Sequence, residues 1–117
     1  MAISNEMTAV RAVTGTLTLA STTTVNSSAR IPAGAVVVDI IMKNNELLVG
    51  AGNVTVVVDT VAQMTAAAAT LTSGNVSRFT PNAAAVTISS NNGGLIGVTT
   101  STNTVGSVDV TVMYIIP

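Results

Sequence analysis

Acid–base chemistry in this 117-residue chain would rest on five carboxylates, Glu6, Asp39, Glu46, Asp59 and Asp109. There is no His and no Cys, so the common general base, the thiol nucleophile and the soft metal ligands are missing. A glycosidase would need two carboxyl groups that converge on one bond. Three of the aspartates share the outward parity of predicted strands, which leaves convergence open, but solvent-facing or salt-bridged strand residues are the simpler interpretation. We therefore predict no catalytic residue and no enzymatic activity.

Metal and phosphate sites are equally weakly indicated. Asp59 together with Asn or Asp side chains has the oxygen chemistry for calcium, but no loop has the spacing of an EF-hand. The glycine-containing segments 50–52 and 93–94 do not open a helix and no Lys follows them, so they predict turns. We expect no metal site and no cofactor.

Charge is sparse along the whole chain. Charged residues make up 8% of the sequence and the net charge is −1, whereas soluble domains have about 25% charged residues. The four cations are scattered, so there is no basic surface for nucleic acid. Either small Thr and Asn side chains coat the surface or other subunits cover it. Obligate interfaces are depleted in charge, which favours the second explanation.

Two kinds of residue are candidates for such an interface. Arg30 beside Pro32 and Arg78 beside Phe79 could each anchor a subunit through bidentate pairing with a carboxylate, although ordinary surface arginines are the alternative. Apolar residues on the outward parity of predicted strands are the second kind. The interface candidates are Arg30, Val37, Ile41, Arg78, Phe79, Met113 and Ile115.

The stretch from Ile31 to Met42 organises the predicted fold. Pro32 and Gly34 favour a tight turn, and the Val- and Ile-rich residues 35–42 favour a strand. Two-residue periodicity gives this strand a core face and an outer face. The predicted core face is Val36, Val38, Ile40 and Met42, and the outer face is Val37, Asp39, Ile41 and Lys43.

The remaining chain has further alternating segments separated by turn signals. Residues 11–20, 54–59, 86–89, 95–100 and 108–116 predict strands, with Gly15 marking a bulge or a close contact. Residues 21–29 indicate an edge strand or an extended loop, residues 61–69 a short helix, and residues 72–84 a loop that holds Phe79. Asn91-Asn-Gly-Gly94 predicts a type I′ hairpin between residues 86–89 and 95–100.

These elements predict one domain. Residues 1–10 read as an N-terminal arm and residues 11–117 as an all-β domain, an antiparallel, jelly-roll-like β-sandwich with at most one short helix. No apolar run approaches the roughly 18 residues of a membrane span, and residues 1–20 have no signal-peptide pattern. The absence of Cys fits assembly in a reducing cytoplasm.

Three parts of the sequence together resemble a known family. The turn Ile31-Pro-Ala-Gly-Ala35 leads into Val36–Ile41, a Val/Thr hairpin follows at 53–59, and an alternating strand closes the chain at 107–116. Over residues 28–117 the pattern resembles small virion structural proteins of tailed bacteriophages. Their polar, Gly-Asp-bearing hairpin is replaced here by the Ala-rich residues 64–69, and the acidic surface is sparser.

The resemblance implies a capsid decoration (cement) or head-fibre protein, commonly a trimer. The expected partners are the major capsid protein and copies of the chain in a homotrimer, with no nucleic acid and no membrane. The expected location is the virion, assembled in the host cytoplasm. The alternative is a carbohydrate- or surface-binding module of a fibre or adhesin, although Phe79 and Tyr114 alone provide little aromatic platform for a sugar.

Overall fold

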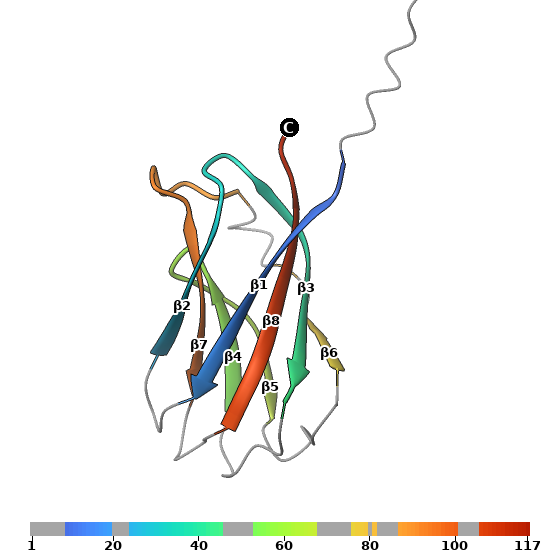
Figure 1. The fold of residues 1–117 in the computed structure, drawn as a ribbon, viewed down its shortest axis with the longest axis vertical. Coiled ribbons are helices and arrows are strands. Elements are labelled where there is room, and N and C mark those ends of the chain that lie inside the picture. The colour runs from blue at the N-terminus through green and yellow to red at the C-terminus, as the bar shows by residue number, and fades with distance from the viewer. Residues whose placement is uncertain are drawn as a thin grey trace, which may run out of the picture.

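The computed structural model describes residues 9–19, 24–45, 53–67, 76–79, 81, 87–100 and 106–117. These residues form eight strands and, within the same ranges, no helix (Figure 1). No helix in this part of the chain is long and apolar enough to cross a membrane. The strands are β1 (Arg11–Leu19), β2 (Thr24–Ile31), β3 (Val36–Asn44), β4 (Asn53–Val58), β5 (Val61–Ala67), β6 (Val76–Phe79), β7 (Gly94–Thr100) and β8 (Gly106–Ile115).

The strands build two four-stranded antiparallel sheets. We call sheet A the one with the order β1-β8-β3-β6, and sheet B the one with the order β2-β7-β4-β5. Successive strands mostly alternate between the two sheets, so the chain crosses the sandwich repeatedly, as in a jelly roll. Figure 1 shows the two sheets face to face. The predicted all-β, antiparallel sandwich is confirmed.

In the strands where Val and Thr alternate, every second side chain fills the space between the sheets. Because successive side chains of a strand point to opposite faces, one apolar set of alternate positions on β1, β4 and β8 points inward, and the Thr positions point outward. This inward set agrees with the sequence prediction. It consists of Leu17, Leu19, Val54, Val56, Val58, Val108, Val110, Val112 and Tyr114.

A bulge in β3 reverses the predicted faces of the first residues of that strand. Val37 pairs with Tyr114 and Asp39 pairs with Met113, so Val38 has no partner in the register with β8. Before the bulge the odd-numbered side chain is buried, with Val37 only 4% exposed, and after it Ile40 is buried. Val38 is 43% exposed. Three successive valines carry no polar alternation to fix the register, and one extra residue switches the face of everything after it.

The predictions for β3 are therefore half wrong. Ile40 and Met42 lie in the core as predicted, but Val36 is only half-buried and Val38 is exposed. Val37 is predicted to face outward as an interface candidate, but it lies in the core. The bulge at Val38 interrupts the alternation, so Val37 and Ile40 point to the same side.

This arrangement predicts opposite results at two adjacent valines. Val37→Ala is expected to lower the free energy of unfolding by about 2 kcal/mol, because it removes two buried methyl groups and leaves a cavity. Val38→Ala is expected to stay within about 0.5 kcal/mol of the wild type, as exposed substitutions do. Urea unfolding of both variants checks this, and a larger loss at Val38 would contradict the bulge.

Two segments form strands that were predicted as other structures. The predicted helix over 61–69 is wrong, because β5 pairs antiparallel with β4, with Asn53 opposite Ala67. Residues 68 and 69 lie outside the described residues. Ala and Met favour a helix only weakly, and strand pairing overrides that preference. The predicted loop that holds Phe79 contains β6, in which Phe79 pairs with Ile40 of β3.

The turn at residues 90–93 differs from the predicted hairpin. The backbone N–H of Gly93 donates to the carbonyl of Ser90 at 3.0 Å, and Gly93 has a φ of +88°. Neither Asn91 nor Asn92 has a positive φ, whereas a type I′ turn requires one at both central residues. Thr87 pairs with Val36 of β3, and the next strand, β7, joins β2 and β4 in sheet B. The segment therefore carries the chain from sheet A to sheet B.

The edges β1 and β2 approach each other closely along one side of the sandwich. The segment predicted as an edge strand or loop over 21–29 contributes residues 24–29 to β2, which lies at the edge of sheet B. At Gly15 a Cβ atom would lie 2.5 Å from Oγ of Ser27. The close contact predicted at Gly15 is therefore confirmed.

Candidate functional site

The three described aspartates do not converge on a common site. Asp39 lies opposite Met113 on β8, four residues from Asp109, which at the usual rise of a strand is about 13 Å. Asp59 lies beyond the end of β4, in the other sheet. No group of three or more His, Cys, Asp or Glu residues suited to a metal ion occurs within the described ranges. Glu6 and Glu46 lie outside them.

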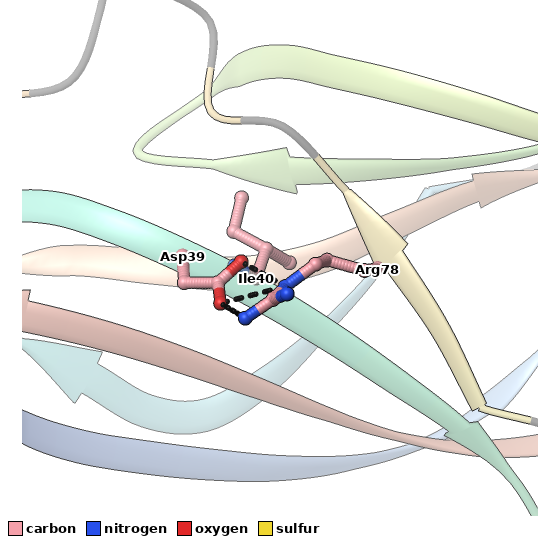
Figure 2. Close-up of polar contacts among 3 residues, drawn as sticks. All are labelled: Asp39, Ile40 and Arg78. Carbon is pink, nitrogen blue, oxygen red and sulfur yellow. Dashed lines mark hydrogen bonds and ion pairs between the residues drawn. The ribbon is translucent and has the colours of Figure 1, made fainter.

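Asp39 pairs with Arg78 across strands β3 and β6, as Figure 2 shows. Nε of Arg78 donates to Oδ2 at 2.9 Å and to Oδ1 at 3.2 Å, and Nη2 donates to Oδ2 at 2.6 Å. The N–H of Ile40 also donates to Oδ1 at 2.9 Å. The side chain of Arg78 is 74% exposed and that of Asp39 is 18% exposed. The carboxylate that pairs with Arg78 thus belongs to its own chain, and a contact of Arg78 with a neighbour stays a prediction.

The pKa of Asp39 is lowered by this arrangement. The hydrogen bond from Arg78 lowers it most, burial opposes this effect, and the Ile40 N–H lowers it further. The ionised carboxylate is therefore favoured in the folded state. Its contribution to stability is present above the ordinary carboxyl pKa and is lost as the pH falls through the lowered value.

Arg78→Gln is expected to raise the titration midpoint of Asp39, because burial remains while the largest lowering contact is removed. Carboxyl ¹³C chemical shifts followed across acid pH measure this midpoint. Asp109 serves as the internal control, since its pKa is lowered by hydrogen bonds from Asn45 and Thr16 and not by Arg78. An unchanged midpoint at Asp39 in the variant would show that the ion pair does not form in solution.

One half of the outer face of sheet A is polar. Hydroxyl and amide groups there form cross-strand hydrogen bonds, from Thr16 to Asp109 at 2.7 Å and from Asn45 to Asp109 at 3.0 Å. The hydroxyls of Thr14 and Thr111 lie 2.9 Å apart. These polar groups are therefore hydrogen-bonded to each other. The hydrogen bonds from Asn45 and Thr16 lower the pKa of Asp109.

The other half of this face combines apolar side chains with the Asp39–Arg78 ion pair, since Asp39 lies opposite Met113 and Arg78 opposite Ile41. Met113 and Ile115 lie half-buried on β8, and the register places β3 residues 36 to 39 opposite them. Val38 projects from the bulge. Ile41 is half-buried and lies opposite Thr111. We call Val38, Ile41, Met113 and Ile115 the apolar strip. Three of its members are sequence-predicted interface candidates, whereas Val38 replaces the predicted Val37.

A second candidate surface lies where three turns meet at one end of the sandwich. These are the β2–β3 turn at 32–35, the β4–β5 turn at 59–60 and the turn at 90–93. The end of β2, the β4–β5 turn, the turn at 90–93 and Leu95 of β7 line a pocket of about 210 Å³, which we call the turn pocket. Its lining residues are Arg30, Asp59, Thr60, Ser90, Asn91, Asn92, Gly93 and Leu95.

Asp59 ties the β4–β5 turn to the segment around the turn at 90–93. One oxygen of its carboxylate accepts from the N–H of Ser89 at 2.9 Å, the hydroxyl of Ser89 at 3.3 Å and the N–H of Ser90 at 3.4 Å. The other accepts from the hydroxyl of Ser90. Its own N–H donates to the carbonyl of Leu95 at 3.0 Å. Burial raises the pKa of Asp59, but the hydrogen bonds from Ser89 and Ser90 together outweigh it and lower the pKa.

The backbone of the β4–β5 turn is left-handed at both of its central residues. Asp59 has a φ of +51° and Thr60 a φ of +67°, as a type I′ turn requires. Such turns usually carry Asn-Gly, and a left-handed conformation costs a residue with a Cβ about 1–2 kcal/mol. The sequence does not predict this site, because Asp59 follows the valines as if it were the last strand residue and its partners lie thirty positions away.

The sequence-predicted arginines lie on different surfaces. Arg30 is exposed at the turn pocket, where Nη1 donates to the carbonyl of Gly93 at 3.4 Å. Arg78 lies on β6 in sheet A, and so does Phe79, whose side chain is outside what the structure describes. The interface candidates therefore form no single patch. Val37 lies in the core, Arg30 lies at the turn pocket, and Arg78 and Phe79 lie on β6 beside the apolar strip.

Comparison with known proteins identifies similar folds and no similar sequences. No protein-family model matches the chain, and no curated protein matches it. A chain of the cyanophage Pam1 capsid asymmetric unit superposes with a TM-score of 0.67 and 18% identity, covering 100% of this chain and 92% of that one. A chain of the capsid of Ralstonia phage GP4 gives 0.61 and 20%, covering 99% and 90%. At these identities the likeness establishes a shared fold.

Proposed function

We propose that the chain is a virion structural protein of a bacteriophage that attaches to the capsid and stabilises it. The observation that carries this proposal is the likeness to chains of two phage capsids, which spans nearly the whole of both partners in each comparison. The matched chains are therefore about as small as this one. Chains of this fold and size occur in two phage capsids, which supports a capsid-attached role.

Contacts with copies of the chain are the second part of the proposal. The apolar strip lies on an outer sheet face whose neighbouring polar groups are already bonded to each other. Burying it against another subunit would remove apolar area from water at about 25 cal/mol per Å² before the costs of association. A homotrimer, with the major capsid protein as the other partner, is the assembly we propose.

A purely structural role completes the proposal. The described aspartates are each engaged by different residues and at different places, so no two of them form an acid–base pair. The net charge of −1 provides no attraction for nucleic acid. The virion is the proposed location, with assembly in the host cytoplasm.

Co-sedimentation with empty shells tests the attachment. The shells are assembled from the major capsid protein encoded in the same genome and are mixed with increasing amounts of the purified chain. We expect saturable binding at a fixed ratio to the shell protein and a higher melting temperature of the decorated shells. A chain that stays in the supernatant at micromolar concentration, while the shells pellet intact, would refute the proposal.

Light scattering tests the self-association separately. The wild type is expected to have the mass of a trimer. Ile115→Lys is expected to reduce it to a monomer, because Ile115 lies opposite Val36 and a buried ammonium group without a partner is costly. Thr14→Lys, on the polar half of the same face, is the matched control. A monomeric wild type would remove self-association from the proposal and leave capsid binding to be decided by sedimentation.

A further inference from the structure

The β4–β5 turn beside the turn pocket has backbone strain that core packing of Thr60 does not offset. Thr60 adopts a φ of +67°, a conformation that is a clear outlier for a β-branched residue. Its side chain is exposed and lines the pocket, so it contributes nothing to the core. Glycine would fit this position of the turn without strain. Strain of this kind concentrates at functional sites, which directs attention to what Thr60 faces.

The walls of the pocket are held rigidly. Asp59 accepts hydrogen bonds from both Ser89 and Ser90, and the N–H of Gly34 donates to the carbonyl of Ile88 at 2.9 Å. Gly93 packs so tightly that a Cβ there would lie 2.6 Å from the carbonyl oxygen of Ile31. A ligand would therefore meet a preformed site, which lowers the ordering cost of binding.

The charges of the lining favour a negatively charged ligand. Arg30 and Asp59 are the ionisable groups in it. The carboxylate of Asp59 already accepts from donors of its own chain. The guanidinium of Arg30 makes one long hydrogen bond to Gly93 and, within the described part of the chain, no ion pair. Its planar donor fork is suited to a carboxylate that accepts two parallel hydrogen bonds.

We propose that the turn pocket receives one acidic side chain, Asp or Glu, of the major capsid protein. The carboxylate pairs with Arg30, and the stem of the side chain rests against Thr60. A volume of about 210 Å³ leaves ample room for one such side chain. This inference rests on the proposed attachment to the capsid and adds the contact point and its chemistry. It also distinguishes Arg30 from Arg78, because Arg78 already holds a carboxylate of its own chain.

Binding of variants to the same empty shells tests the pocket. Arg30→Gln is expected to weaken co-sedimentation roughly tenfold or more, because it removes the charge and the bidentate geometry. Arg30→Lys keeps the charge and should recover only part of the affinity. Arg11→Gln removes the same charge from an exposed residue of β1 and should bind like the wild type.

Thr60→Gly separates binding from folding. The variant relieves the left-handed strain, so its melting temperature should equal or exceed that of the wild type, while its binding to shells should be several-fold weaker. If the wild type binds shells and Arg30→Gln and Thr60→Gly bind equally well, the pocket is not the contact and the proposed function stands. If the wild type itself does not bind, the proposed function fails and this inference fails with it. Equal losses for Arg30→Gln and Arg11→Gln would indicate a diffuse charge effect and overturn the specific pairing.

Discussion

Asp59→Ala is expected to lower the free energy of unfolding by about 3 kcal/mol at neutral pH. The substitution removes the acceptor of four hydrogen bonds from Ser89 and Ser90 and leaves two backbone N–H groups without it. Hydrogen bonds to charged groups contribute about 1.5–3 kcal/mol each, and these four share one carboxylate, so their losses do not add. Urea unfolding measures the change.

Asp109→Ala is the matched control for this variant. Asp109 also accepts side-chain hydrogen bonds, from Thr16 and Asn45, but on an outer sheet face, where we expect a loss of about 1 kcal/mol or less. If Asp59→Ala costs no more than Asp109→Ala, Asp59 does not hold the β4–β5 turn to the turn at 90–93.

The stability that Asp59 provides is expected to depend on pH in a defined direction. Its pKa is lowered in the folded state, so its ionised form contributes stability above the ordinary carboxyl pKa, and this contribution is lost as the pH falls through the lowered value. The difference in unfolding free energy between wild type and Asp59→Asn should therefore shrink in acid. A difference that grows in acid would mean that the folded state favours the protonated carboxyl.

Gly15→Val is the second substitution with a large expected effect, a loss of about 3 kcal/mol. A Cβ at this position would lie 2.5 Å from Oγ and 2.7 Å from Cβ of Ser27, so β1 and β2 would have to separate where the two sheets meet. Overpacking of this kind costs typically about 1–3 kcal/mol, and the branched side chain places it at the upper end. Thermal or urea unfolding measures it.

Two further variants isolate the cause. Ser27→Gly should rescue much of the loss caused by Gly15→Ala, because it removes the two atoms that the new Cβ would meet. Gly34→Ala should cost only about 1 kcal/mol, since no heavy atom lies within 4 Å of its added Cβ and the φ of +82° is the only obstacle. If Ser27→Gly gives no rescue, β1 and β2 do not touch at Gly15.

The sequence predicts the strands in which Thr and apolar residues alternate strictly. Around Leu17, Val56 and Val110 the buried face can be read directly, because a period of two leaves one possible core side. The Pro32–Gly34 turn is predicted from its residue types, and Gly34 has the positive φ that glycine tolerates. These elements were enough to indicate an antiparallel sandwich.

The sequence does not predict features that depend on contacts between distant residues. Nothing in Val36-Val37-Val38 identifies the bulged residue, since all three are equally apolar and the register is set by β8. The residues of β5 favour a helix when taken alone, and pairing with β4 decides otherwise. The turn pocket joins Arg30 of β2, Asp59 of the β4–β5 turn and Ser90 of the turn at 90–93, and only the fold brings these positions together.

Cryo-electron microscopy of empty shells incubated with the purified chain tests the central claim most directly. The proposal predicts ordered density for the two-sheet sandwich at a repeated position on the outer shell surface, with the end that carries the turn pocket directed toward the shell protein. Shells that reconstruct without any added density at saturating chain concentration would contradict it.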